Sequence, residues 1–182
     1  SGTSSLAATA IRHAADNGAD IISMSFGADE PSLIMEEACR YAWEKGCILV
    51  AASGNNGSSP ISYPATYNTV IAVGSIGRTG LWSSFSNYGT DLDLVAPGES
   101  ILSTTPGNTY TFKSGTSMAC PHVSGVAALL LSRYPGMANL DVRERLAGTA
   151  DDLGAPGRDA RYGYGRVNAF AALGGGEVIP PT

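Results

Sequence analysis

The sequence predicts an α/β fold built on a mostly parallel sheet, and two observations lead to this prediction. Apolar segments with helical spacing alternate with short apolar runs that are typical of buried strands, and the connections between them are short. Tandem units of this kind indicate parallel strands flanked by helices. The chain has 182 residues, of which 43% are hydrophobic, so it is long enough for one domain with a single core.

The first half of the chain contains two successive helix and strand units. Apolar residues recur at helical spacing over residues 6–14, and the segment DIISMSFG at 20–27 then reads as a short buried strand. The segment PSLIMEEACRYAWEKG at 31–46 again has helical periodicity and ends in glycine, and CILVAASGNNG at 47–57 is an apolar run stopped by glycines. This alternation of helices and strands is typical of a fold built from βαβ units.

The middle of the chain is rich in strands and leads to a long helix that begins near Ser117. The expected strands lie in TVIAVGSI at 69–76, LDLVAPG at 92–98, ILSTT at 101–105 and YTFKSGTS at 110–117. In parallel sheets, ligands collect at the carboxyl ends of the strands. The segments MSFG, AASGNNG and SGTS lie at or just beyond such ends, so we expect the functional site there.

Composition excludes several kinds of partner. The formal charge is −5 and only 11 residues are Lys or Arg, which argues against nucleic acid. No stretch approaches the roughly 20 apolar residues that cross a bilayer, and the first residues lack the pattern of a secretion signal. Cys39, Cys47 and Cys120 show no C-x-x-C spacing, so we interpret them as small buried apolar residues.

The segment SGTSMACPHVSG, which starts at Ser114, places a hydroxyl where a helix begins. Ser117 would lie among unpaired backbone N–H groups at the positive end of the helix dipole, an arrangement that favours an oxyanion. Gly115 would let a substrate come close, Ser114 or Thr116 could cap the helix, and Pro121 would be tolerated within its first turn. The simpler alternative is that Ser117 only caps the helix.

This segment closely resembles the nucleophile motif of the subtilisin-like serine proteases, the subtilase family. AASGNNG, IISMSFG, LDLVAPG and GYGRVNAFAAL resemble further motifs of that family and occur in its order. The resemblance implies a three-layer fold with a mostly parallel sheet flanked by helices, of which this chain is the carboxyl-terminal two-thirds, without the amino-terminal strands. Residues 1–173 would belong to this catalytic domain, and 174–182 would form a tail or linker.

The resemblance also implies a serine endopeptidase that forms an acyl-enzyme at Ser117. The side chain of Asn55 and the backbone N–H of Ser117 would bind the tetrahedral oxyanion, and Thr116 would support this hole. Taken alone, Asn55 reads as a turn residue. An extended peptide would bind to two short segments and a pocket floor, formed by Ser25, Phe26, Gly27, Ala52, Ser53, Gly54 and Ser62. The small pocket walls suggest a large apolar or aromatic residue before the scissile bond.

Asp93, with backbone carbonyls near Ala65, Tyr67 and Val70, resembles a weak cation site of the family. Oxygen ligands suit Ca²⁺ or Na⁺, so a structural Ca²⁺ is expected, whereas no organic cofactor is. The alternative is a solvated Asp at the end of a strand. The family resemblance also implies an extracellular or secreted protein.

A catalytic base is missing from the sequence. Serine chemistry needs a base oriented by a carboxylate, but neither of the family's D-[ST]-G and H-G-T segments occurs here. His122 follows Ser117 by five residues on one helix, so it points about 140° away, and His13 lies in the first amphipathic helix. We therefore expect a preceding segment to supply the Asp and His. The alternative is a non-catalytic peptide-binding or scaffold module derived from a protease.

Overall fold

The structure, a computed structural model, describes residues 3–175, and its centre is a parallel sheet of four strands. The strands lie side by side in chain order: β1 (Ile21–Met24), β2 (Ile48–Ala52), β3 (Val70–Ile76) and β4 (Leu94–Pro97). All residues of β2 and β3 are buried, which explains their continuous apolar sequence. The expected parallel α/β architecture is confirmed.

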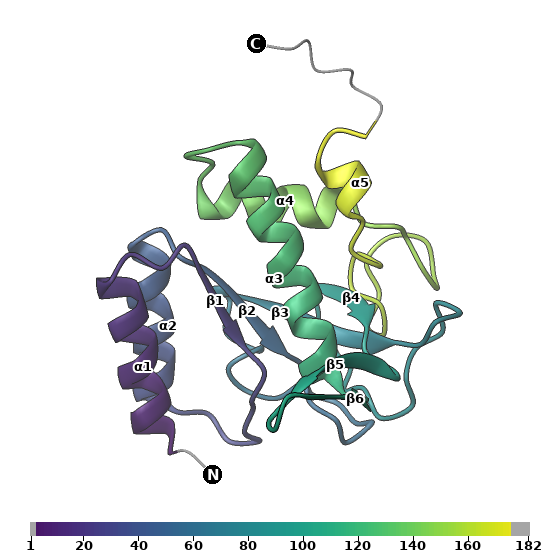
Figure 1. Cartoon of the computed structure of the whole chain (residues 1–182), viewed down its shortest axis with the longest axis horizontal. Coiled ribbons are helices and arrows are strands. Elements are labelled where there is room, and N and C mark those ends of the chain that lie inside the picture. Colours follow the sequence, from purple (N-terminus) through teal and green to yellow (C-terminus); the bar gives the residue numbers. More distant parts are fainter. Residues whose placement is uncertain (1–2, 176–182) are drawn as a thin grey trace.

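Helices cover both faces of this sheet (Figure 1). On one face, α1 (Ser4–Asp16) and α2 (Leu33–Glu44) pack against each other and against alternate residues of β2. On the other face, α3 (Thr116–Arg133) crosses all four strands and contacts the remaining residues of β2. The alternation follows the two-residue period of a strand, and it makes the fold three-layered.

Two helices were not expected from the sequence pattern. The helices α4 (Asn139–Gly148) and α5 (Ala169–Ala172) complete the layer beside α3, where Val142, Leu146 and Ala172 are buried. Gly174 and Gly175 close the turn after α5 through backbone hydrogen bonds. The rest of the expected tail lies outside the described residues.

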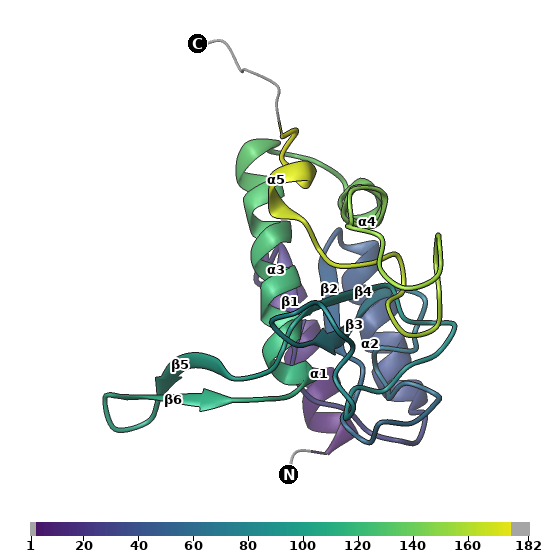
Figure 2. The ribbon, with the colours of Figure 1, turned by 90° about the vertical axis from the view of Figure 1, so that its right-hand side faces the viewer.

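The strands β5 (Ile101–Thr105) and β6 (Thr109–Lys113) form a separate antiparallel hairpin. Figure 2 shows it projecting from the body of the molecule, close to the start of α3. Both strands were expected, but they are not part of the parallel sheet. Leu102, Tyr110 and Phe112 of this hairpin are exposed.

One side of the molecule exposes apolar surface. Within residues 3–175, β1 pairs with β2 alone, so its outer edge is open. The neighbouring face of α3 exposes Pro121, Gly125, Ala128 and Leu129, and the sequence contains no Asp, Glu, Lys or Arg from residue 116 to 132. A helix that is apolar around its whole circumference is normally buried. In the described part of the chain, no helix is long and apolar enough to span a bilayer.

Candidate active site

The amino terminus of α3 is capped by Asn55, a residue from the loop after β2. The backbone N–H and the hydroxyl of Thr116 both donate to Oδ1 of Asn55, at 2.8 and 3.0 Å. The expected cap from Ser114 or Thr116 is wrong, because the hydroxyl oxygen of Ser114 instead accepts a bond from Ser100 N–H at 2.9 Å. Gly115 precedes the helix with φ 152°, a conformation that side chains rarely adopt.

This cap leaves the Nδ2 group of Asn55 available. Among residues 3–175 it donates to no protein acceptor, and a Cβ placed at Gly115 would lie 3.6 Å from it. Ser117 is the second residue of α3, so its N–H lacks a partner within the helix. Because Thr116 binds Asn55 directly, these two donors are neighbours. The arrangement can stabilise a developing oxyanion.

Ser117 is tied to Ser25 by a reciprocal pair of hydrogen bonds. The hydroxyl of Ser117 donates to the Ser25 carbonyl at 3.2 Å, and the hydroxyl of Ser25 donates to the Ser117 carbonyl at 2.8 Å. The second bond follows from Pro121, which has no N–H to give to the carbonyl four residues earlier. Pro121 is the sixth residue of α3, so the expectation that it lies in the first turn is wrong. The hydroxyl of Ser25 was not singled out from the sequence.

The expected substrate-binding segments converge on Ser62. A Cβ at Gly27 would lie 3.1 Å from Cβ of Ser62, and a Cβ at Gly54 would lie 2.5 Å from its Oγ. The N–H of Ser62 donates to the Ser53 carbonyl at 2.8 Å. Ser25 and Phe26 are exposed beside β1, whereas the side chain of Ala52 packs in the core below α3.

A cavity of about 530 Å³ adjoins the segment 25–27 and was missed by sequence reasoning. Its walls come from the start of α1, from residues 26–35 and from residues 63–67, and they include Leu6, Ala7, Phe26, Met35, Tyr63 and Tyr67. No short motif signals this cavity, because three distant segments build it. It extends the apolar surface next to the candidate peptide groove.

Neither histidine is bonded to Ser117. Nδ1 of His122 donates to the carbonyl of Met118 at 2.8 Å, and His13 contacts Asn17, which caps the carboxyl end of α1. A cavity of about 350 Å³ lies between β5 and the start of α3, and Ser117 and His122 line it together with Met118. Ser117 therefore has an open side, and the base expected from outside the chain could approach there.

The three cysteines are free and buried, as expected. Burial raises the pKa of the Cys39 thiol to about 12 and also raises the pKa values of Cys47 and Cys120. Their thiols therefore stay protonated at neutral pH. The cysteines are therefore not candidate nucleophiles.

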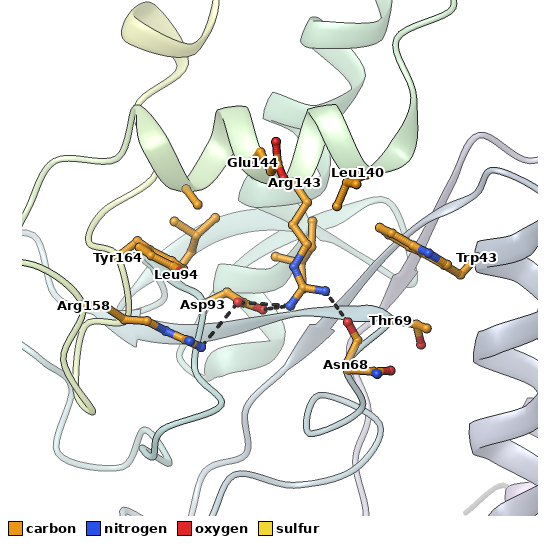
Figure 3. Close-up of a pocket in the computed structure, with 12 residues that line it drawn as sticks. Trp43, Asn68, Thr69, Asp93, Leu94, Leu140, Arg143, Glu144, Arg158 and Tyr164 are labelled. Carbon is orange, nitrogen blue, oxygen red and sulfur yellow. Dashed lines mark hydrogen bonds and ion pairs between the residues drawn. The ribbon is translucent and has the colours of Figure 1, made fainter.

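Asp93 lies in an ion-pair cluster (Figure 3). Its carboxylate accepts the Ala72 N–H at 2.9 Å, and Nη2 of Arg143 lies 3.2 and 3.1 Å from its two oxygens. Arg158 approaches to 3.6 Å. Arg143 descends from α4 into a cavity of about 400 Å³ and also donates to the Asn68 carbonyl.

These contacts bear on the expectation of Ca²⁺ at Asp93, which stays a prediction. Two guanidinium groups already neutralise the carboxylate, and one backbone N–H takes a further position on it. Of the expected carbonyl ligands near Ala65, Tyr67 and Val70, that of Tyr67 accepts the Val70 N–H at 2.9 Å. In residues 3–175 there is no group of three His, Cys, Asp or Glu that could hold a metal ion. The carboxylate of Asp93 is therefore already held by ion pairs, with which a cation would have to compete.

Comparison with known proteins finds several similar proteases. A thermophilic serine proteinase of Bacillus sp. (strain AK1) is 49% identical over 173 residues, which are 95% of this chain and 42% of that protein. Subtilisin DY of Bacillus licheniformis is 46% identical over 94% of this chain and 63% of its own length. The chain thus spans less than two thirds of these curated relatives.

Solved structures share the fold. The prenylagaramide maturation protease PagA superposes with a TM-score of 0.87 at 34% identity, covering 96% of this chain and 68% of its own. Sphericase gives a TM-score of 0.86 at 34% identity, covering 92% and 64%. Residues 1–165 match the model of the subtilase family. The chain therefore belongs to the subtilase family of serine proteases.

Proposed function

We propose that this chain is part of a serine endopeptidase that cleaves peptide bonds through an acyl-enzyme at Ser117. The observation that carries the proposal is the bond of Thr116 to Oδ1 of Asn55, which leaves Nδ2 of Asn55 beside the amino terminus of α3. A module that only bound peptides would need a groove but no oxyanion site. The non-catalytic alternative is therefore less favoured.

In the proposed reaction, Oγ of Ser117 attacks the carbonyl carbon of the scissile bond while a base removes its proton. The oxyanion of the tetrahedral intermediate accepts hydrogen bonds from Nδ2 of Asn55 and the N–H of Ser117. The protonated base then gives its proton to the leaving amine, and the acyl-enzyme forms. Water then attacks the acyl carbon while the base removes a proton from it. The base returns this proton to Oγ of Ser117 as the acid is released.

The groove would hold the substrate in an extended form. The backbone of residues 25–27 would pair with the peptide as an added strand, with residues 53–54 on the opposite wall. The residue before the scissile bond would point toward Ser62. The wall segments contain no carboxylate to attract a basic side chain, which favours a large apolar one. Family membership further suggests an extracellular protein.

The base and its orienting carboxylate would come from a preceding segment. Two features support this part of the proposal: the open outer edge of β1 and the exposed apolar face of α3, which flank Ser117. A segment that paired with β1 and covered this face would bury both. Without it, the isolated residues 1–182 should aggregate or form a loosely packed monomer on size exclusion, and a compact monomer that melts cooperatively would contradict this.

The decisive experiment is fluorophosphonate labelling of the chain with and without the preceding segment. Strong labelling is expected only with the segment, should vanish in Ser117→Ala, and should fall sharply in Asn55→Ala. The loss of such an oxyanion donor is known to cost about 10²–10³-fold in a subtilisin. Strong labelling of the chain alone would reveal a base within it, with His13 the first to test. Peptide binding without any labelling of the complete protein would favour the scaffold alternative.

A further inference from the structure

Asn87 is a buried polar residue that the proposed mechanism does not use. It lies in the irregular segment between β3 and β4 and is 1% exposed. Its side-chain oxygen accepts the N–H of Asn56 at 2.8 Å and that of Ser58 at 3.3 Å. A buried amide whose oxygen takes two backbone donors from one loop fixes the path of that loop.

The backbone of Asn87 holds the same loop from its other end. Its N–H donates to the Gly54 carbonyl at 2.9 Å, and its carbonyl accepts the hydroxyl of Ser53 at 3.2 Å. Asn55 lies between Gly54 and Asn56, so Asn87 anchors the residues on both sides of the oxyanion donor. Asn87 does not touch Asn55 itself through any of these bonds.

The side chain of Asn87 also reaches the candidate pocket floor. Its Nδ2 group donates to Oγ of Ser62 at 3.3 Å. The packing at this point is close, since a Cβ at Gly54 would lie 2.3 Å from Nδ2 of Asn87 and 2.5 Å from Oγ of Ser62. One side chain thus connects the loop that carries Asn55 with the residue expected to limit the pocket.

We propose that Asn87 is a positioning residue, which sets the place of Asn55 in the oxyanion site and of Ser62 in the pocket. The proposal rests on the proposed endopeptidase function. Removal of the amide would leave the N–H groups of Asn56 and Ser58 without their acceptor, and the loop would shift to find water. A displacement of about 1 Å in a catalytic group can cost about 10²-fold in rate.

The test compares Asn87→Ala and Asn87→Asp with Ser83→Ala in the full-length protein. Ser83 is a matched control, because it is buried in the same segment and its hydroxyl bonds Ser75 at 2.8 Å, away from the loop. We expect kcat on a peptide nitroanilide to fall about 10- to 100-fold in Asn87→Ala, with little change in KM. Asn87→Asp should recover most of the lost kcat, since a carboxylate oxygen can accept hydrogen bonds from the same two N–H groups. The kcat of Ser83→Ala should match that of the parent.

A second measurement does not depend on activity. Hydrogen exchange at the N–H groups of Asn56 and Ser58 should accelerate in Asn87→Ala and not in Ser83→Ala. Exchange as slow as in the parent, or a kcat equal to that of Ser83→Ala, would overturn the proposal. If the parent itself were inactive, the endopeptidase function would fail and the exchange data alone would decide whether Asn87 holds the loop. Asn87→Ser replaces Asn87→Ala if that variant does not fold.

Discussion

The ion-pair cluster at Asp93 should make a large contribution to stability, and Asp93→Asn tests it. The side chain of Asp93 is 7% exposed and that of Arg143 is 24% exposed, so the pair is largely screened from water. Asparagine keeps an acceptor for the Ala72 N–H but loses the charge. Breaking a buried pair leaves an uncompensated charge and costs about 3–5 kcal/mol, and Arg158, which is 38% exposed, adds little.

We therefore expect Asp93→Asn to lower the free energy of unfolding by about 3 kcal/mol. The matched control is Asp151→Asn, because Asp151 also pairs with an arginine, Arg166, at 2.6 Å, but the two side chains are 35% and 46% exposed. That pair should be worth about 0–1 kcal/mol. Urea unfolding of the full-length protein, in a Ser117→Ala background that prevents self-digestion, measures both losses.

The same experiment separates the ion pair from a cation site. If Asp93 bound Ca²⁺, the difference between parent and Asp93→Asn would grow with calcium concentration. The ion-pair arrangement predicts the same difference in calcium and in a chelator. A loss no greater than that of Asp151→Asn would refute the argument from burial.

Two further predictions concern oxidation and acid. Peroxide should inactivate the complete enzyme by converting Met118, the neighbour of Ser117, to its sulfoxide, and Met118→Ala should resist; equal rates of activity loss in both would contradict this. Hydrogen bonds from Arg166 and Asn168 lower the pKa of Asp151 in the folded protein below its ordinary 3.8. The ionised Asp151 therefore stabilises the folded state fully above pH 3.8, and this contribution is lost as the pH falls through the folded pKa. The stabilities of parent and Asp151→Asn should therefore converge in acid, and a difference that persists there would disprove the linkage.

Periodicity predicts most of the fold, because the strongest patterns belong to buried elements. The strands β2 and β3 are continuous apolar runs, and α1 and α2 have clear apolar faces. The helix α4 was missed because it buries only Val142 and Leu146 among charged residues. The hairpin of β5 and β6 was expected as two strands, but nothing local in ILSTT indicates that it leaves the parallel sheet.

The sequence predicts a site residue when that residue lies in a motif. It does not predict a residue whose role depends on a contact with a distant part of the chain. Asn55 and Ser117 lie in motifs, but the bond between Asn55 and Thr116 joins residues 61 apart in the chain. Arg143 is 50 residues from Asp93, so the family resemblance suggested a cation ligand at Asp93 but not this ion pair. Asn87 lies outside every segment that the sequence singled out. In each case the partner comes from another element, and only the fold brings the two together.

The double role of Asn55 leads to a last prediction. Its Oδ1 caps α3, whereas its Nδ2 is the proposed oxyanion donor. Asn55→Ala should therefore lose the cap, worth about 1 kcal/mol, and most of the reaction rate. Asn55→Asp separates the two roles. A carboxylate accepts the same bonds from Thr116 and interacts favourably with the positive end of the helix dipole, so stability should equal or exceed that of the parent.

The aspartate cannot donate a hydrogen bond, however, and its charge repels an oxyanion. Fluorophosphonate labelling of Ser117 in the complete protein should therefore be at least as slow in Asn55→Asp as in Asn55→Ala, although Asn55→Asp unfolds at the higher urea concentration. An aspartate variant that labels like the parent would show that Nδ2 does not contact the oxyanion. A stability as low as that of Asn55→Ala would show that the cap contributes nothing, because the acceptor alone distinguishes the two variants at Thr116.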